Sequence, residues 1–345
     1  MKIVYLGSGA FGLPTLVSIA REHQLLTVVT QPDRPAGRGG AMTPTPIAAW
    51  IAEHHVKIPI IKPLKVNVPE VVAAIRAFNP DAFVIIAFGQ KLGKGLLDGI
   101  PAMNLHASLL PRWRGAAPIN AAILAGDTIT GNSVITLADR MDAGLVLAQS
   151  TREISPILTA GELHDLLAID GPTLVREVLA RVARGDQGGT AQDESLVTIA
   201  PKMSKEDGWI DFNASADACR QRVHGLTPWP GVTVKMVIPG NNNNNNNNND
   251  NNDDGTNNPP TEHLLKILRV QTANETSQQP QRPASVAHEP GLIIDLEWGL
   301  VACGDRTAIN LLEVQPPGKR SMSWADFARG RQISPGTRLI GGRPT

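Results

Sequence analysis

An asparagine and a histidine, Asn104 and His106, stand on either side of Leu105 near the end of a short apolar run. An amide can donate hydrogen bonds, and an imidazole can titrate near neutral pH and move a proton. If the run is a strand, alternation places both side chains on one face of the sheet. Ligands of open α/β sheets bind beyond the carboxyl ends of the strands, where this pair would lie. Alone, Asn-x-His is a weak signal, because such a pair also occurs for structural reasons.

The residues that follow strengthen a catalytic interpretation. Directly after His106, the segment Ala107–Pro118 combines turn-forming residues with two arginines and a tryptophan, which a loop that only connects two elements does not need. Further along the chain, the segment Arg140–Gly144 places a carboxylate, Asp142, in a loop before a predicted strand. We therefore predict a catalytic site made by Asn104, His106 and Asp142.

These motifs together resemble those of the folate-dependent formyltransferases. The shared pattern is Asn-x-His followed by Ser-Leu-Leu-Pro, with Asp-x-Gly downstream. Three further segments are most similar to the methionyl-tRNA formyltransferases of that family, namely Arg112–Pro118, Gln31–Gly39 and Gly318–Ser323. The resemblance covers nearly the whole chain outside an Asn-rich insertion.

The resemblance implies that a formyl group is transferred from 10-formyltetrahydrofolate to an amine. Such a transfer passes through a tetrahedral intermediate with a negatively charged oxygen, and a fixed hydrogen-bond donor at that oxygen accelerates it by on the order of 10²–10³. By the family match, Asn104 and His106 polarise the formyl oxygen, and Asp142 orients the histidine and supports proton transfer. The implied folate contacts are Ser108, Leu109, Leu110, Pro111, Phe88, Gln90 and Leu92.

The acceptor that the resemblance implies is the methionyl group of initiator tRNA, which would place the enzyme in translation initiation. Lys+Arg and Asp+Glu are equal at 32 each, so contact with phosphates requires local clusters of basic residues. One cluster lies in the Gly- and Pro-rich loop Pro32–Pro44, and another begins near Arg306 in the C-terminal part. The predicted tRNA contacts are Arg34, Arg38, Lys202, Lys205, Lys319 and Arg320.

The first half of the chain alternates between strand-like and helix-like segments. The strand-like segments are Ile3–Leu6, Leu25–Thr30, Ala82–Ala87, Ala102–His106, Gly131–Leu137 and Leu145–Ser150. The helix-like segments are Phe11–Glu22, Pro44–His54, Pro69–Phe78, Ala116–Leu124 and Glu162–Arg184. This alternation predicts an α/β catalytic domain over residues 1–189, with a Rossmann-like, mostly parallel sheet and helices on both faces.

The second half has a different character. We predict a linker over residues 190–205 and then, over residues 206–345, a small OB-like β-barrel that binds tRNA. The helix Ala214–His224 is followed by short strands, Val232–Ile238, Leu264–Val270, Gly291–Leu296, Gly299–Cys303 and Ala308–Leu312. An Asn-rich insertion at about 240–262 lacks apolar residues, so we expect it to be disordered, and we expect the polar stretch Asn274–Glu289 to behave similarly.

Three other functions fit parts of the sequence. Gly7–Gly12 matches the G-x-G-x-x-G pattern of NAD-binding domains, but the second predicted strand ends at Gln31 without the acidic residue that holds the ribose. A formyltransferase acting on a small amine, such as an amino-sugar nucleotide, would have little need for the arginine-bearing loop and a basic second domain. A non-enzymatic RNA-binding protein is disfavoured, because Asn104, His106 and Asp142 would have no function in it.

Composition bears on whether the protein holds a metal and on where it is located. The two cysteines, Cys219 and Cys303, have no paired spacing and no neighbouring histidine, so we predict reduced thiols and no metal site. The N-terminus has no signal or transit pattern, and no apolar run approaches the ~20 residues that span a bilayer. We therefore expect a cytoplasmic protein that does not contact membranes and acts as a monomer.

Overall fold

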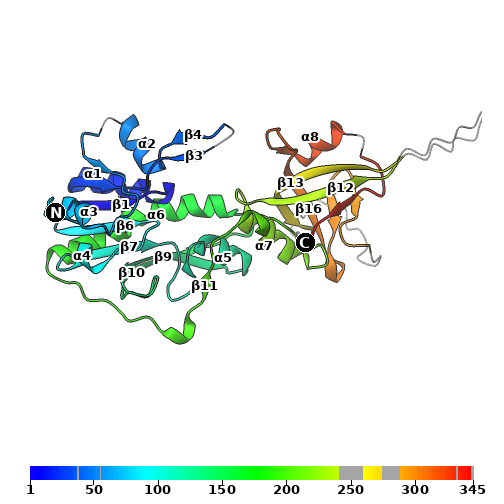
Figure 1. Cartoon of the computed structure of the whole chain (residues 1–345). Coiled ribbons are helices and arrows are strands. Elements are labelled where there is room, and N and C mark those ends of the chain that lie inside the picture. Colours follow the sequence, from blue (N-terminus) through cyan, green and yellow to red (C-terminus); the bar gives the residue numbers. More distant parts are fainter. Residues whose placement is uncertain (37–38, 55, 241–258, 274–287, 332, 343–345) are drawn as a thin grey trace, which may run out of the picture. The chain divides into compact units, whose positions relative to one another are not determined.

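The computed structural model describes residues 1–36, 39–54, 56–240, 259–273, 288–331 and 333–342. The chain forms two compact units (Figure 1). The first comprises Met1–Ile119, Thr128–Ile154 and Glu162–Lys202, and the second comprises Asn120–Asp127, Ser155–Gly161 and Met203–Thr345. Arg38, the Asn-rich insertion up to Asn258 and most of Asn274–Glu289 lie outside the described residues.

A seven-stranded sheet with the order β10-β9-β7-β6-β1-β2-β5 forms the centre of the first unit. Its strands are β1 (Lys2–Gly7), β2 (Gln24–Val29), β5 (Ile60–Ile61), β6 (Ala82–Ile86), β7 (Ala102–His106), β9 (Ile129–Thr136) and β10 (Val146–Glu153). The five strands from β7 to β5 are parallel, whereas β9 runs antiparallel to β7 and β10 antiparallel to β9. Every residue of β6 is buried, as expected for a parallel strand covered on both faces. The predicted mostly parallel sheet is confirmed.

The five predicted helices of this half of the chain are present with small shifts at their ends, and one further short helix, Lys94–Leu97, was not predicted. The helices are η1 (Ala10–Gly12), α1 (Leu13–Glu22), α2 (Pro46–Glu53), α3 (Pro69–Arg76), α4 (Lys94–Leu97), α5 (Pro118–Leu124) and α6 (Ala160–Ala183). Three starts have a local cause: Thr45 caps α2 through its side chain, and proline occupies the first turn of α1, α2 and α3.

The two faces of β7 have different roles. A Cβ atom added at Gly171 of α6 would meet Leu105 of β7 and Thr15 of α1, so Leu105 faces these two helices. Asn104 pairs in register with Ile85 on β6 and with Ile135 on β9, and His106 pairs with Ser133 on β9. Because side chains alternate along a strand, Asn104 and His106 share the face opposite Leu105.

The glycine-rich turn after β1 has a packing explanation. Tyr5 is fully buried, and its hydroxyl donates a hydrogen bond to the carbonyl oxygen of Gly12 at 3.1 Å. A Cβ atom at Gly12 would collide with that hydroxyl. Glycine is therefore required here by the close approach of Tyr5, and no dinucleotide is needed to explain the motif.

Two short strand pairs lie in segments that the sequence presents as loops. β3 (Arg34–Ala36) and β4 (Ala41–Thr43) pair antiparallel within Pro32–Pro44. Residues 190–205, which we predict as a linker, contain β11 (Ile199–Ala200), and β11 pairs in parallel with β8 (Arg114–Gly115). The same stretch holds two short 3-10 helices, η2 (Glu194–Leu196) and η3 (Lys205–Asp207).

The second unit is built on an antiparallel sheet with the order β14-β15-β16-β13-β12-β18, and β17 pairs with β16. Its strands are β12 (Val232–Ile238), β13 (Thr261–Thr272), β14 (Ile293–Asp295), β15 (Leu300–Ala302), β16 (Ala308–Gln315), β17 (Met322–Ser323) and β18 (Arg338–Ile340). A bridge between Leu292 and Arg338 brings the two ends of the sheet together, so the sheet is a nearly closed barrel. The predicted small C-terminal barrel is confirmed.

Two helices accompany the barrel, α7 (Ala216–Leu226) and α8 (Trp324–Arg329). The unit has its own apolar core, to which α7 contributes Val223 and Leu226 and α8 contributes Trp324. Both cysteines are free and buried. In the described part of the chain, no helix has the length and apolar character needed to cross a membrane.

His224 of α7 is a buried histidine held in its neutral form. It is 0% exposed; its Nδ1–H donates to the carbonyl oxygen of Pro156 at 3.0 Å, and its Nε2 accepts from the Val270 N–H at 3.2 Å. Burial is the main cause that lowers the pKa of His224 to about 4, opposed by the hydrogen bond to Pro156 and reinforced by the charges of Arg220 and Arg269. Protonation would place a second N–H against the Val270 donor.

This histidine predicts a pH dependence of stability. The pKa of His224 in the folded chain, about 4, lies below its ordinary value of 6.5, so the unfolded chain takes up the proton first as pH falls. The stabilisation is therefore complete above about pH 6.5 and is lost towards pH 4, with a total of about 3 kcal/mol. Urea unfolding at pH 7.5 and pH 5 should show a smaller loss for His224→Gln than for the wild type. His288→Gln, at an exposed histidine of the same unit, should match the wild type, and equal losses in all three proteins would contradict the assignment.

Candidate active site

His106 lies at the carboxyl end of β7, and its two ring nitrogens have different partners. The side chain is 7% exposed, and Nε2 lies 2.9 Å from the carbonyl oxygen of Trp113. A carbonyl oxygen only accepts hydrogen bonds, so Nε2 carries the hydrogen in this contact. Nδ1 then faces the carboxylate of Asp142, with 3.6 Å between Nδ1 and Oδ2. A proton can be exchanged between these two groups after a small approach.

Asp142 is held in place by its backbone as well as by its carboxylate. Its φ of 51° lies in the left-handed region, which is costly for a residue other than glycine and is found mainly where the surrounding structure enforces it. The carboxylate, 14% exposed, accepts a hydrogen bond at Oδ2 from the Gly115 N–H at 2.9 Å. The structure therefore brings together the histidine and the aspartate that the sequence predicts.

Gly144 explains why glycine ends the Asp-x-Gly motif. A Cβ atom at this position would collide with the backbone carbonyl of Thr136 on β9. Close beside it, the Thr136 N–H donates to the carbonyl oxygen of Leu145 at 3.0 Å. The glycine thus lets the Asp142 loop lie directly against the end of β9.

Asn104 supplies an unused amide next to this pair. Its side chain is half-buried on the same face of β7 as His106. Among the described residues, none forms a hydrogen bond with this amide, although an amide can donate two and accept two. An unengaged donor beside a histidine is suited to stabilising an oxygen that becomes negatively charged.

A turn of four residues follows β7, and hydrogen bonds to β9 and β10 hold it against the sheet. The hydroxyl of Ser133 donates to the carbonyl oxygen of Ser108 at 2.6 Å and accepts from the Leu110 N–H at 3.1 Å. Gln149 of β10 donates to the Ser133 hydroxyl and to the Leu110 carbonyl oxygen, at 2.8 and 3.0 Å. Ser108 is fully buried, and its hydroxyl donates to the carbonyl oxygen of Arg112.

The loop after β6 uses its side chains within the protein. Phe88 is 2% exposed in the apolar core, and Leu92 packs against that core. The Gln90 amide accepts from the Val66 N–H at 2.8 Å and donates to the carbonyl oxygen of Pro63 at 3.2 Å. The side chains of Phe88 and Gln90 are thus engaged in contacts that shape the loop.

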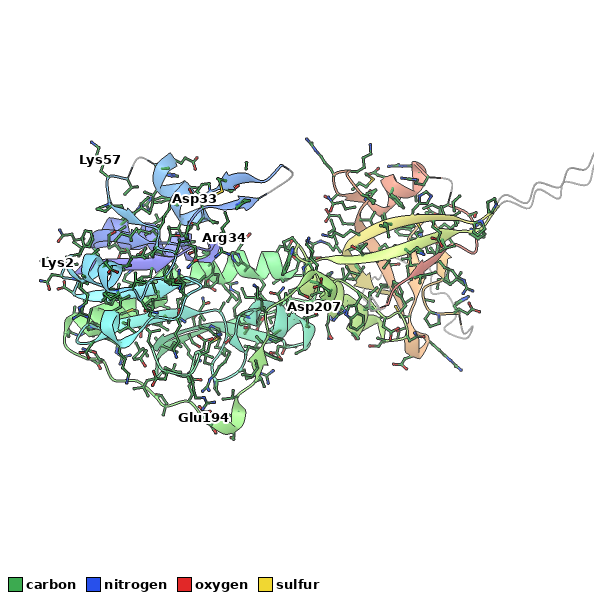
Figure 2. All side chains as sticks on the ribbon, viewed as in Figure 1. Lys2, Asp33, Arg34, Lys57, Glu194 and Asp207 are labelled. Carbon is green, nitrogen blue, oxygen red and sulfur yellow. The ribbon has the colours of Figure 1, made fainter. Side chains whose placement is uncertain are left out.

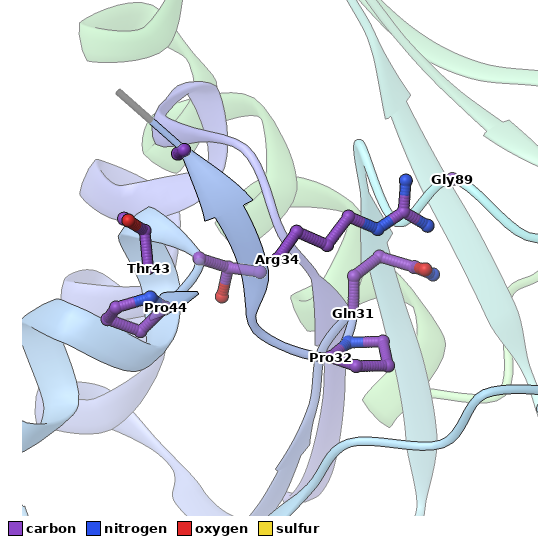
Figure 3. Close-up of a pocket in the computed structure, with 8 residues that line it drawn as sticks. Gln31, Pro32, Arg34, Thr43, Pro44 and Gly89 are labelled. Carbon is purple, nitrogen blue, oxygen red and sulfur yellow. The ribbon is translucent and has the colours of Figure 1, made fainter. Parts of the chain in front are cut away.

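A pocket of about 370 Å³ opens beside the end of β2. Figure 3 shows the Arg34 side chain extending along it towards Gln31 and Gly89. The remaining lining residues are Pro32, Ala36, Thr43, Pro44 and Thr45. The pocket is therefore mainly apolar, with one cationic group at its side.

Comparison with known proteins decides the family. The pattern described as "Formyl transferase" matches residues 1–179, and that described as "Formyl transferase, C-terminal domain" matches residues 202–332. The chain belongs to the formyl transferase family. It is 39% identical to a methionyl-tRNA formyltransferase of Citrifermentans bemidjiense over 97% of this chain and 95% of that protein. It is 37% identical to a methionyl-tRNA formyltransferase of Geobacter sulfurreducens over 98% of this chain and 96% of that protein.

Solved structures of low sequence identity share the fold. HypX from Aquifex aeolicus, in complex with tetrahydrofolic acid, matches with a TM-score of 0.57 and 16% identity over 95% of this chain, which spans only 46% of that protein. An N-formyltransferase from Helicobacter canadensis, in complex with folinic acid and dTDP-3-aminofucose, matches with a TM-score of 0.59 and 14% identity, covering 90% and 98% of the two chains. At such identities these likenesses concern the fold alone.

The basic residues of this formyl transferase that the sequence predicts as tRNA contacts lie in both units. Arg34, which is labelled in Figure 2, and Lys202 belong to the first unit and are exposed. The second unit carries Lys205, Lys319 and Arg320, which are also exposed.

Several polar residues that shape the site were not predicted from the sequence. Ser133 and Gln149 lie on predicted strands, and a buried serine within an apolar strand was the one available signal for Ser133. Gln192 and Glu194 lie in the predicted linker, yet both contact Arg114, a buried side chain. In the described part of the chain, no group of three or more His, Cys, Asp or Glu side chains is arranged to hold a metal ion.

The packing of Gly144 predicts a loss of activity on substitution. In Gly144→Ala the new Cβ atom must push the loop away from Thr136, which moves Asp142 away from His106. We expect the kcat of formyl transfer to fall by about 10–100-fold. Gly95→Ala is the matched control, because a Cβ atom there meets open space. Steady-state kinetics of both variants tests this, and wild-type turnover in Gly144→Ala would contradict it.

Proposed function

We propose that this protein transfers the formyl group of 10-formyltetrahydrofolate to the α-amine of methionine on initiator tRNA. The observation that carries the proposal is the His106–Asp142 pair beside the unengaged amide of Asn104, in a chain that matches methionyl-tRNA formyltransferases over nearly its full length. We also propose that the protein acts as a monomer. The acceptor tRNA places the reaction in the cytoplasm.

The chemistry requires a new bond between the methionine nitrogen and the formyl carbon, and the bond from that carbon to the folate nitrogen must break. Asn104 donates hydrogen bonds to the formyl oxygen as negative charge develops on it. His106 and Asp142 accept the proton that the attacking amine releases and return a proton to the departing folate nitrogen. The formyl group thus passes from the folate to the methionine nitrogen, and one proton passes from the methionine amine to the folate nitrogen.

Features of the described residues fit a folate donor. The turn from Ser108 to Pro111 follows β7 directly, and Leu109 and Pro111 are half-buried there, which leaves them apolar surface for a flat ring. The loop after β6 carries Phe88, Gln90 and Leu92, and contacts within the protein hold their side chains. We therefore assign this loop a supporting role in the donor site. Ser108 and Leu110 hold the turn in place through their hydrogen bonds.

The acceptor would be bound by cations of both units. Arg34 at its pocket, Lys202, Lys205, Lys319 and Arg320 are exposed and can neutralise phosphates of the tRNA. Arg38 lies outside the described residues and is included on the sequence resemblance.

Removal of the catalytic pair should abolish most turnover without abolishing binding. His106→Ala and Asp142→Asn should lower kcat by about 10²–10⁴, because proton transfer to and from the reacting nitrogens is impaired. Binding of Met-tRNA should stay near the wild-type value, because neither buried side chain reaches a phosphate. His164, which pairs with Asp165 at 2.9 Å, is the matched control, and His164→Ala should keep its activity.

The assay uses 10-formyltetrahydrofolate and charged initiator tRNA, and detects formyl-methionine after release from the tRNA. Normal turnover of His106→Ala would contradict the catalytic assignment. Formylation of an amino-sugar nucleotide without formylation of Met-tRNA would contradict the acceptor assignment.

Arg34 should contribute to the affinity for tRNA and not to the chemical step. Arg34→Ala should raise KM for Met-tRNA and leave kcat nearly unchanged. The slope of the tRNA binding constant against salt concentration, both on logarithmic scales, should fall by the amount that corresponds to about one phosphate contact. Lys57→Ala removes an exposed cation of the same unit between α2 and β5 and serves as the control. Titration at several salt concentrations measures both slopes, and identical slopes for wild type and Arg34→Ala would contradict this role.

A further inference from the structure

The segment Thr190–Ala200 contacts the chain on both sides of the catalytic pair. At its start, Thr190 and Val146 exchange two backbone hydrogen bonds of 2.8 and 2.9 Å, just beyond the Asp142 loop. At its end, β11 pairs with β8, and Thr198 accepts from the Arg114 N–H through its carbonyl oxygen at 2.9 Å. The segment therefore joins the two stretches of chain that carry the partners of His106 and Asp142.

Gln192 is the side chain of this segment that contacts the Asp142 loop. Its Nε2 donates to the carbonyl oxygen of Asp142 at 2.7 Å and to that of Gly144 at 2.8 Å. Its Oε1 accepts from Nε and a terminal nitrogen of Arg114, at 2.9 and 2.8 Å. All four hydrogen bonds that a glutamine amide can make are formed, so the orientation of the amide is fixed.

Arg114 gives Gln192 a rigid support. The guanidinium is 2% exposed and also donates to Glu194 at 2.9 Å, and Glu194 in turn pairs with Arg140 at 3.0 Å. Figure 2 marks Glu194 at the edge of the first unit. A buried guanidinium without partners would be strongly unfavourable, so the chain must keep Gln192 and Glu194 in place around it.

The same stretch of chain also contacts the catalytic groups. Gly115 follows Arg114 and donates its N–H to the Asp142 carboxylate at 2.9 Å. Trp113 precedes Arg114 and accepts the hydrogen bond of His106 at 2.9 Å. A displacement of this stretch or of the Asp142 loop would thus change the distance between the imidazole and the carboxylate.

We propose that Gln192, supported by Arg114, is a positioning residue that holds Asp142 against His106. It does so by binding the carbonyl oxygens on both sides of Ala143, which fixes the left-handed backbone at Asp142. Gln192 touches no reacting group itself. Its effect on turnover rests on the function proposed above, whereas its effect on the loop can be measured without any substrate.

The first test follows the Gly115 amide by hydrogen exchange in the full-length protein. The Gly115 N–H is protected by its bond to Asp142, so Gln192→Ala should speed its exchange by about tenfold or more. Gln187→Ala, at an exposed glutamine of the preceding segment, is the matched control and should leave the exchange unchanged. Unchanged exchange at Gly115 in Gln192→Ala would overturn the proposal, whatever the substrate of the enzyme proves to be.

The second test is a double-mutant cycle on formyl transfer to Met-tRNA. Gln192→Ala should lower kcat by about 10–100-fold with KM nearly unchanged, because the catalytic pair is misplaced while the binding surfaces remain. Once Asp142 is already replaced by asparagine, adding Gln192→Ala should cost less than about twofold more, because Gln192 then has no carboxylate to position. Full additivity of the two losses would overturn the proposal. Absence of formylation by the wild type would instead count against the proposed function, and the exchange test would still decide on Gln192.

Gln192→Glu separates the two halves of the interaction. A glutamate keeps an acceptor for Arg114, but it has no N–H to offer the carbonyl oxygens of Asp142 and Gly144, and its second carboxylate oxygen would repel them. We expect faster exchange of the Gly115 amide, as in Gln192→Ala. Wild-type exchange in this variant would show that the two N–H donors are dispensable, which would overturn the proposal.

Discussion

The approach of the Asp142 carboxylate to the His106 imidazole is the contact that the loops around the end of β7 must position. The two groups lie 3.6 Å apart and are 14% and 7% exposed, so water does little to solvate either of them. A carboxylate in such a position needs hydrogen-bond donors from the protein, and the backbone of Gly115 supplies one. The fold must therefore bring three separate stretches of chain together: the end of β7, the β8 segment and the loop before β10.

The reversal of direction at one edge of the sheet makes this meeting possible. β7 ends at His106, and β9 lies beside it in the opposite direction, with Ser133 in register with His106. The chain leaves β9 after Thr136 and returns in β10, so the connecting loop that carries Asp142 is formed within the same edge of the sheet. The His106–Asp142 pair is thus a consequence of the antiparallel addition of β9 and β10 to a parallel sheet. The parallel strands alone would leave His106 without its carboxylate.

The sequence was sufficient for the parts of the site that depend on local patterns. An apolar strand places Asn104 and His106 on one face whatever the rest of the chain does, and an Asp-x-Gly turn is visible as such. It was insufficient where hydrogen bonds join remote segments. Gln192 contacts the Asp142 loop across 50 residues of sequence, and neither periodicity nor composition marks such a partner. A polar stretch rich in turn formers looks like a linker, so β11 and its pairing with β8 could not be predicted from the sequence alone.

The polar network around the buried Arg114 connects the packing of the segment Thr190–Ala200 with the position of the Asp142 loop. Removing a single partner of a buried guanidinium costs more than the interaction contributes, because the remaining charge stays desolvated. Both partners lie in the segment Thr190–Ala200, so the buried charge of Arg114 favours the arrangement in which this segment stays next to the Asp142 loop. Glutamine suits position 192, because the position requires one acceptor for a cation and two donors for carbonyl oxygens, and an uncharged amide provides both.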